Sequence, residues 1–433
     1  MNQAIARQRS QVFRYAGLDV TATSLVGHYQ LDGIDFSERV DFEGVDSLET
    51  PAIVAVAQLW YLLAGLSYYK AGAAHRVDVG PMPLGEHGRA LLVGALQEGL
   101  AEFAYRNQLP LGDVVVEGGT PTQNYLPLVD TNRVLIPFGG GIDSVVTVEE
   151  LAEHLERALF VVSPASGRFT PLEDTARVTK LPVVRVTRTL DPKIIRVDDS
   201  FFVGHVPVTA MVTLLACVAA LASGRGGVAM SNEHSSSVAN LRWLDVDVNH
   251  QWSKSWRAEE LLAEAVAERV GREFVVASFL RDRSELWVAQ RFSRLRQYHH
   301  VFRSCNLAFS QRREDRANAW CATCDKCLFV NLVLAPFLKR AELRAIFNAE
   351  PLSDPARRDQ LRTLVGLGDV HKPFECVGDP DESAVALQEV SRLDEWSDVA
   401  WLDEVALLAS PERDLDDLLE RQGPSRVPTN WLR

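Results

Sequence analysis

The feature that most constrains the fold of this chain is a regular alternation of short apolar runs and helical patterns beginning at Arg133. The runs are rich in β-branched residues, and stretches with helical periodicity separate them. The expected strands are residues 134–138, 159–163, 183–187, 228–231 and 273–278, and the expected helices are 144–157, 207–223 and 259–270. This spacing predicts an α/β fold in which helices cover both faces of a parallel sheet.

Different patterns flank this central part. Residues 12–45 alternate as in a β-meander, and two helical stretches follow at 50–71 and 84–106. After residue 336 the chain becomes helical again. We therefore expect a small N-terminal α+β region (residues 1–125), an α/β domain with a cysteine cluster (126–340) and a helical, acidic C-terminal extension (341–433).

Charge and composition narrow the class of protein. The 58 acidic residues outnumber the 45 basic ones, which argues against a general nucleic-acid binder. Residues 379–420 hold 14 of the acids and only two arginines, so the rest of the chain is nearly neutral. The apolar stretch 206–222 is interrupted by threonines and is shorter than the ~20 residues of a membrane span. With no signal-peptide pattern and only six cysteines, we expect a cytoplasmic protein without a membrane span.

A glycine loop stands at the first strand-to-helix join. The run 134–138 leads into three glycines (139–141), then Asp143 and Ser144, and then a helical pattern. Glycines let consecutive backbone N–H groups face one point, and the next helix adds its positive dipole end. The join therefore predicts an anion-binding site, although it is neither a Walker loop nor a GxGxxG turn. The alternative is a simple turn in which Asp143 only caps the helix.

Three cysteines lie within seven residues. Cys321, Cys324 and Cys327 form a C-x2-C-x2-C pattern, and Cys305 lies upstream. Four thiolates of this spacing suit a structural Zn²⁺ ion, and the alternatives are an Fe–S cluster or free reduced thiols. Cys217 lies in an apolar helical stretch and is expected in the core.

Three polar islands occur later in the chain. They are residues 231–237 (SNEHSSS), 249–255 (NHQWSKS) and 371–378 (HKPFECVG). The first follows an expected strand, at the sheet edge where ligands bind in doubly wound folds. Of only seven lysines, Lys254, Lys326 and Lys372 lie in these islands or beside the cysteines. Any one island alone is more often a capped loop than a site. The candidate substrate contacts are Asn232, Glu233, Asn249 and Lys372.

The glycine loop resembles the PP-loop, S-G-G-x-D-S, of ATP pyrophosphatases, whose fold is adenine nucleotide α-hydrolase-like. Gly139 stands where that superfamily usually has Ser, and the other positions match. The resemblance implies that ATP is cleaved between its α and β phosphates and that a substrate oxygen is adenylated. The loop would hold the leaving pyrophosphate, and Mg²⁺ would share its charge. The implied nucleotide-binding residues are Gly139, Gly140, Gly141, Asp143 and Ser144.

The ordered set of motifs resembles one family closely, the UDP-N-acetylmuramoyl-L-alanyl-L-glutamate epimerases of bacterial peptidoglycan precursor synthesis. The set is GGGIDS (139–144), SNEHSS (231–236), VNHQWSKS (248–255), SCN (304–306), WCATCDKC (320–327) and HKPFECVG (371–378). The resemblance runs from about residue 130 to about residue 378, is weaker before that and does not include the acidic tail. It implies ATP-dependent conversion of the terminal L-glutamate of a UDP-linked muramoyl dipeptide to D-glutamate, with release of AMP and pyrophosphate.

This chemistry requires two proton-handling groups on opposite faces of the α-carbon. Adenylation of the α-carboxylate would remove the negative charge that opposes loss of the α-proton. Cys376 is the first choice, because a lone thiol in a polar island is hard to explain by packing, although a structural role is the alternative. The candidate catalytic residues are Asp143, Lys254, Cys376, Glu375, His371 and His250.

Other interpretations stay open at this point. The segment 281–316 has nine arginines against four acids, which suits a solvated helix face, a clamp for the UDP diphosphate or a surface for RNA backbone. The chain could instead be a PP-loop enzyme that adenylates a nucleobase or tRNA, or a zinc-bearing binding protein with an inactive loop. We expect a UDP-linked muramoyl dipeptide as partner and no nucleic acid, and the oligomeric state is open.

Overall fold

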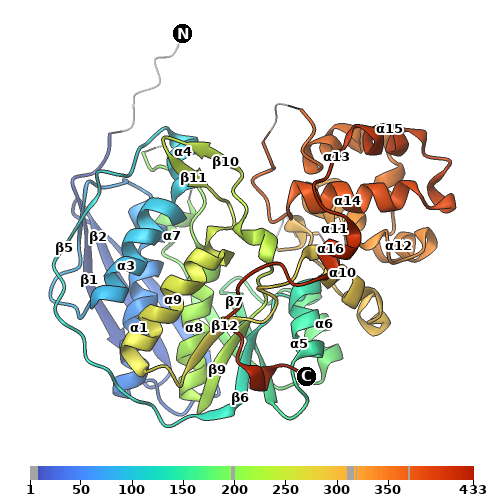
Figure 1. The fold of residues 1–433 in the computed structure, drawn as a ribbon. Coiled ribbons are helices and arrows are strands. Elements are labelled where there is room, and N and C mark those ends of the chain that lie inside the picture. The colour runs from blue at the N-terminus through green and yellow to red at the C-terminus, as the bar shows by residue number, and fades with distance from the viewer. Residues whose placement is uncertain (1–7, 197–199, 310–315, 318, 369–370) are drawn as a thin grey trace.

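A ten-stranded mixed sheet runs through the part of the chain that the computed structural model describes (Figure 1). That part comprises residues 8–196, 200–309, 316–317, 319–368 and 371–433. Neighbouring strands follow the order β12-β9-β6-β7-β8-β3-β2-β1-β4-β5. The strands are β1 (Val12–Val20), β2 (Ser24–Leu31), β3 (Ile34–Glu43), β4 (Arg76–Asp78), β5 (Val115–Glu117), β6 (Asp130–Pro137), β7 (Glu156–Pro164), β8 (Val183–Thr189), β9 (Arg225–Met230) and β12 (Val275–Ser278). A separate ribbon pairs β10 (Leu241–Trp243) with β11 (Val246–Val248).

The half of the sheet formed by the chain from β6 onward is parallel. β12, β9, β6, β7 and β8 pair in parallel in that order, so β7 lies on one side of β6 and β9 on the other. The chain therefore reverses its direction of winding at β6. In doubly wound sheets ligands bind beyond the carboxyl ends of the strands at such a reversal, which is where the glycine loop lies.

Helices cover both faces of this sheet, so the predicted α/β class is confirmed. Along β6, Leu135 packs into a core on one face, whereas Val134 and Ile136 pack into a second core on the other. The first face carries α1 (Pro51–Ala64), α2 (Leu66–Tyr69), α3 (Glu86–Gly94), α4 (Ala101–Asn107), α8 (Val208–Ala222) and α9 (Trp256–Val270). Among these, α1 packs against α8 and α9, and α3 packs against α9 (Figure 1).

The second face carries α5 and α6 from the middle of the chain and all the helices of the C-terminal part. Its helices are α5 (Ile142–Glu150), α6 (Thr170–Thr179), α10 (Glu285–Ser293), α11 (Asp325–Leu334), α12 (Arg340–Phe347), α13 (Arg358–Leu364), α14 (Pro380–Ser391), α15 (Ala400–Leu408) and α16 (Leu415–Leu419). Shorter elements are α7 (Pro192–Ile195), a π-helical turn (Ala95–Gly99) and 3₁₀ helices at His234–Ser237, Trp252–Lys254, Arg296–Tyr298, Asn306–Phe309, Pro351–Ser353, Pro355–Arg357, Asp394–Trp396 and Thr429–Trp431. Helices α11 to α16 gather at one end of the molecule (Figure 1).

The N-terminal meander joins the same sheet through β3 and β8, which pair antiparallel. At this seam the fully buried carboxylate of Glu38 accepts a hydrogen bond of 2.6 Å from Arg188 Nε. The sheet is thus continuous across residue 125, and the division of the chain into three regions stays a prediction.

The helical stretch Pro51–Tyr69 is long and apolar enough to cross a membrane by length and composition alone. However, 89% of its most apolar window is buried inside the protein, where it belongs to the core of the first face. A core helix passes the same test, so this stretch is weak evidence for a membrane span.

Two expected helices differ from the structure. The helix predicted at 144–157 is wrong at its end, because α5 ends at Glu150 and β7 begins at Glu156. The backbone N–H of Ala152 donates to the carbonyl of Trp431, so a contact from the far end of the chain replaces the next helical turn. The stretch 84–106 forms α3 and α4 with the π-helical turn between them rather than one regular helix.

Candidate active site

The glycine loop joins β6 to α5 at the reversal of the sheet. Gly140 has a φ of +75°, which residues with a side chain rarely adopt. Gly141 is the N-cap of α5, and no described side chain caps that end, so Asp143 does not serve as the cap. The first N–H groups of α5 therefore lack a side-chain partner within the described residues, as an anion-binding helix end requires.

A short downstream segment lies against this loop. The backbone N–H of Arg303 donates to the Gly140 carbonyl at 3.4 Å. A Cβ at Gly141 would lie 2.6 Å from the Ser304 hydroxyl oxygen. The Ser304 hydroxyl thus lies beside the glycine loop.

Three carboxylates follow the ends of adjacent strands. Asp143 follows β6, Glu233 follows β9 and Glu285 follows β12. Burial and the charge of Glu233 raise the pKa of Asp143 to about 6, and the same two causes raise the pKa of Glu285. One oxygen of Asp143 and one of Glu285 are buried without a hydrogen-bond partner among the described residues. Buried carboxylates with free oxygens suit a hard divalent cation such as Mg²⁺, although the oxygens of these three residues do not all lie within 4.8 Å of one another.

Three lysines, Lys254, Lys326 and Lys372, lie near these carboxylates. Burial opposes the charge of Lys254, but the negative charges of Cys376 and Glu233 outweigh it and raise its pKa. The Lys372 ammonium is buried without a hydrogen-bond partner among the described residues, and burial lowers its pKa. The charge of Lys326 partly offsets the repulsion among the carboxylates.

The thiol of Cys376 lies close to the imidazole of His250, and the two side chains interact. Burial would raise the pKa of the thiol, but the charge of Lys254 and the bond to His250 lower it to about 6. Burial likewise opposes the charge of His250, but its bonds to Cys376 and Glu102 raise its pKa to about 9. Near neutral pH the pair is therefore a thiolate and an imidazolium, the state in which a cysteine acts as a base or nucleophile.

Asparagines connect the polar islands. Asn249 Nδ2 donates to the Ser236 carbonyl at 3.0 Å, and its Oδ1 accepts from the Gln251 N–H at 2.8 Å. The backbone groups of Asn232 both bond to the Ser278 hydroxyl at the end of β12. The side chain of Asn249 is thus engaged in holding the islands together.

Arg281 fixes the first two islands against each other. Its guanidinium is 1% exposed and donates from Nε to Glu259 at 2.8 Å. It also donates to the backbone carbonyls of Glu233 at 2.8 Å and Lys254 at 2.5 Å. The solvated-face interpretation of the arginine segment is therefore wrong for Arg281, and residues 310–315 of that segment lie outside the described residues.

The two remaining catalytic candidates, Glu375 and His371, differ in their surroundings. Glu375 is partly buried and accepts a hydrogen bond of 3.1 Å from the Lys326 N–H, at the start of α11. His371 is exposed. The structure thus brings Cys376, Lys254, Asp143 and His250 into one cluster but leaves His371 at the surface.

Sequence reasoning missed several members of this cluster. Glu102 and His205 lie in segments without any motif, so no local signal could have marked them. Glu285 follows the strand at 273–278 much as Glu233 follows β9, so its place after a strand could have identified it. Glu382, from the acidic segment, is fully buried and accepts a hydrogen bond of 2.7 Å from the Glu285 N–H.

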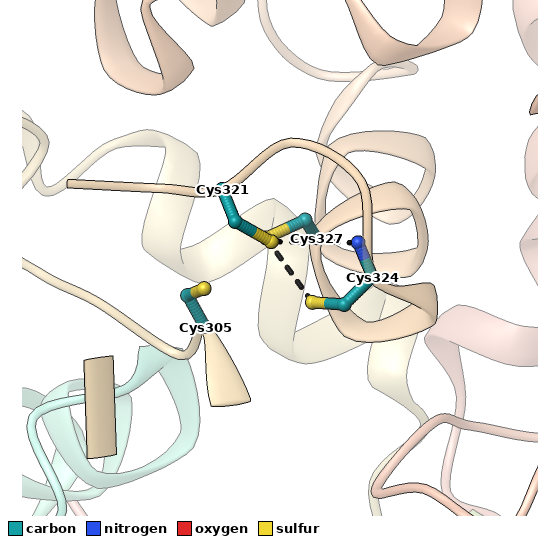
Figure 2. Close-up of side chains that lie close together, drawn as sticks. All are labelled: Cys305, Cys321, Cys324 and Cys327. Carbon is teal, nitrogen blue, oxygen red and sulfur yellow. Dashed lines mark hydrogen bonds between the residues drawn. The ribbon is translucent and has the colours of Figure 1, made fainter. Parts of the chain in front are cut away.

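The four clustered cysteines face one another (Figure 2). Their sulfur atoms all lie within 4.8 Å of one another, with Cys321–Cys327 at 3.6 Å and Cys324–Cys327 at 3.4 Å. Zinc–sulfur bonds of about 2.3 Å in a tetrahedron place sulfurs about 3.8 Å apart, so these residues fit a Zn²⁺ ion. Cys305 reaches the cluster from the segment that contacts the glycine loop. Cys217 is buried in α8, as expected for a core residue.

The fold and the site define an α/β protein that has buried acidic and basic side chains next to a glycine loop at a helix N-terminus. Comparison with known sequences identifies the family more closely. The MurL N-terminal domain model matches residues 4–279, and the MurL C-terminal domain model matches residues 301–417. The chain therefore belongs to the MurL family.

Curated relatives carry one name, UDP-N-acetyl-alpha-D-muramoyl-L-alanyl-L-glutamate epimerase. The protein from Salinispora tropica is 37% identical over 99% of this chain and 96% of its own length. The one from Micromonospora sp. is 36% identical over the whole chain and 99% of its own length, and that from Xanthomonas oryzae pv. oryzae is 33% identical over 87% and 84%. The expected extent of the resemblance was too short, because the family match begins at residue 4 and includes most of the acidic segment. No solved structure matches the chain significantly.

Proposed function

We propose that this chain is an ATP-dependent epimerase that inverts the terminal glutamate of UDP-N-acetylmuramoyl-L-alanyl-L-glutamate during cytoplasmic synthesis of peptidoglycan precursors. The shared name of its relatives supports the substrate and the type of reaction. The observation that carries the proposal is the Cys376–His250 pair, because loss of an α-proton requires a base that is deprotonated near neutral pH.

ATP makes the α-proton removable. In the free peptide the carbanion would form beside a carboxylate, and the two negative charges would repel each other. In the proposed reaction a carboxylate oxygen attacks the α-phosphorus of ATP, a P–O bond to pyrophosphate breaks, and an acyl-adenylate forms. The acyl group is then uncharged and accepts the electron pair of the C–H bond as an enolate.

The glycine loop is the proposed site of the pyrophosphate. Its resemblance to a PP-loop, the free N–H groups of α5 and the position at the sheet reversal support this assignment. Ser144 Oγ donates back to the Gly141 carbonyl at 3.1 Å and so stabilises the loop. We propose that the Ser304 hydroxyl takes the place of the hydroxyl that Gly139 lacks.

The carboxylates Asp143, Glu233 and Glu285 would hold Mg²⁺. Their burial, their mutual repulsion and the free oxygens of Asp143 and Glu285 support this assignment. When bound, Mg²⁺ supplies positive charge for the phosphates of the nucleotide.

The proposed proton transfer uses the Cys376 thiolate, which takes the α-proton, while the cation of Lys254 faces the negative charge that develops nearby. Reprotonation from the opposite face inverts the centre, and water then releases AMP and the free carboxylate. The unpaired ammonium of Lys372 is the proposed contact for a substrate carboxylate. We propose that Zn²⁺ on the four cysteines is structural, because its four ligands leave no open position.

The test is incubation of the protein with ATP and the L-glutamate substrate in deuterated water. We expect AMP and pyrophosphate to form only with substrate present, and deuterium to enter at the α-carbon of the glutamate. Asp143→Asn should lose both products, and Cys376→Ser should lose only the deuterium. Absence of substrate-dependent AMP in the unmodified protein would refute ATP dependence, and absence of deuterium would refute epimerisation.

A further inference from the structure

The N-terminal region contributes a buried acid to the candidate active site. Glu102 lies on α4 and is 4% exposed. Its Oε2 lies 2.5 Å from His250 Nδ1, across 148 positions of the sequence, and its Oε1 accepts a hydrogen bond of 2.7 Å from Arg106 Nε. Both oxygens of the carboxylate therefore have partners, and one of these is the histidine beside Cys376.

The short contact between Glu102 and His250 is a direct hydrogen bond. The donor atoms of Glu102, His205 and His250 lie within 4.8 Å of one another, so these side chains could also be considered as metal ligands. Metal bonds of about 2.0–2.2 Å would hold two ligand atoms about 3 Å apart, which is wider than the 2.5 Å found here. The two atoms are joined by a direct hydrogen bond in this structure.

The surroundings hold the ring in one orientation. The His250 backbone N–H donates to Asn240 Oδ1 at 2.8 Å, and its ring packs at 4.3 Å from the ring of His205. Burial and the charge of His250 lower the pKa of His205 to about 4, so His205 is neutral near pH 7. Because Nδ1 donates to Glu102, the other ring nitrogen is left to face the thiol.

Helix α4 also contacts the segment that carries the thiol. Tyr105 packs against Phe374 with ring centroids 5.8 Å apart, and the Arg106 guanidinium lies 4.8 Å from the centre of the same ring. One helix of the N-terminal region thus contacts both the histidine and the chain two residues before Cys376.

We propose that Glu102 is a positioning residue: by accepting the Nδ1 proton of His250, it fixes the tautomer and orientation in which this ring faces the Cys376 sulfur. The inference rests on the proposed function, because it assigns Glu102 a part in the proton transfer of that site. The role is the one that a buried carboxylate plays for a catalytic histidine in hydrolases.

Other charged groups also affect the pKa of the Cys376 thiol. Groups on the elements around it are Lys254, Lys326, Lys372, Asp143 and Glu375. Loss of Glu102 leaves these in place but removes the support for the imidazolium. His250 then loses its proton at a lower pH, so its positive charge no longer favours the thiolate and the pKa of Cys376 rises.

The experiment measures the alkylation of Cys376 by iodoacetamide at graded pH, with mass spectrometry of the peptide that contains it. We expect a wild-type midpoint near 6, and Glu102→Gln should move the pH midpoint of alkylation upward by about one unit or more. The matched control is Glu98→Gln, one turn earlier, which removes a carboxylate bonded to Trp252 Nε1 at 2.9 Å and should leave the midpoint unchanged. An unchanged midpoint in Glu102→Gln, or an equal shift in both variants, would overturn the proposal.

A double variant separates positioning from a general structural role. His250→Gln should shift the midpoint at least as far as Glu102→Gln, and the two changes together should shift it no further than His250→Gln alone. Additive shifts would contradict the inference. Glu102→Asp keeps the charge and should give an intermediate midpoint, which covers the case in which Glu102→Gln does not fold.

Alkylation needs neither ATP nor substrate. Absence of deuterium exchange in the wild-type protein would therefore refute the proposed function. The alkylation midpoints would still show whether Glu102 affects the pKa of Cys376. With an active enzyme, the low-pH limb of the exchange rate should move with the alkylation midpoint in each variant.

Discussion

Replacing Arg281 with methionine should destabilise the protein strongly, because this buried cation bonds to a carboxylate, two backbone carbonyls and a hydroxyl. The change leaves the Glu259 carboxylate, which is 5% exposed, without its cation and removes the donors to the carbonyls of Glu233 and Lys254. Breaking a buried ion pair from one side costs about 3–5 kcal/mol. Compared with a typical total stability of about 5–15 kcal/mol, this is a large share.

Urea denaturation followed by tryptophan fluorescence measures the effect as a lower unfolding midpoint. The exposed pair Arg272–Glu264 provides the control, since Arg272→Met should hardly move the midpoint. The double variant Arg281→Met with Glu259→Leu should recover part of the loss, because no unpaired charge then remains buried. A wild-type midpoint in Arg281→Met, or no recovery in the double variant, would refute the reasoning.

Further predictions concern the thiol, the loop and the cysteines. Deuterium exchange followed by NMR should be lost in Cys376→Ser while AMP release continues; unchanged exchange would exclude a role of this thiol in proton transfer. Because burial and the neighbouring cations set the pKa of Cys376 to about 6, exchange should be constant above that pH and fall as the thiolate is protonated below it; a rate that rises on acidification would contradict this. Gly140→Ala should lower the free energy of unfolding by about 1–2 kcal/mol, because its φ is +75°, and should weaken ATP binding measured by calorimetry. Gly139→Ser should keep the wild-type unfolding midpoint, because no described atom lies within 4 Å of a Cβ at that position. Metal analysis should find one zinc ion per chain and much less in Cys305→Ser; iron in its place would exclude the zinc assignment.

Local patterns were sufficient to predict much of the sheet. The five strands expected after Arg133 all occur. Short apolar runs rich in β-branched residues between helical stretches are typical of buried parallel strands. The end of α5 at Glu150 could not be predicted, because the backbone N–H of Ala152, just beyond it, donates to the carbonyl of Trp431, far along the chain. The pairing of β3 with β8 also depends on residues 142 to 150 positions apart.

Some residues of the candidate site could be predicted from local patterns, and others depend on contacts distant in the sequence. Cys376, Lys254 and Lys372 were recognisable because a thiol and rare lysines stand out in polar islands. Glu102 was not, because an acid on an amphipathic helix is ordinary until the fold places it beside His250. The free N–H groups of α5 were predictable from glycine loop chemistry, whereas the Ser304 hydroxyl reaches the loop only through tertiary contact.

The seam between β3 and β8 has a consequence during synthesis of the chain. At about 5–20 residues per second, β3 emerges roughly 7–30 s before the strand that completes its edge. In that interval its backbone N–H and C=O groups can pair with another nascent chain, as exposed sheet edges do. Charged side chains at Asp35, Glu38, Arg39 and Asp41 oppose such pairing while the strand waits. A fragment that stops at residue 125 would keep this edge open permanently and leave Glu38 without Arg188, so a soluble truncation has to extend beyond β8.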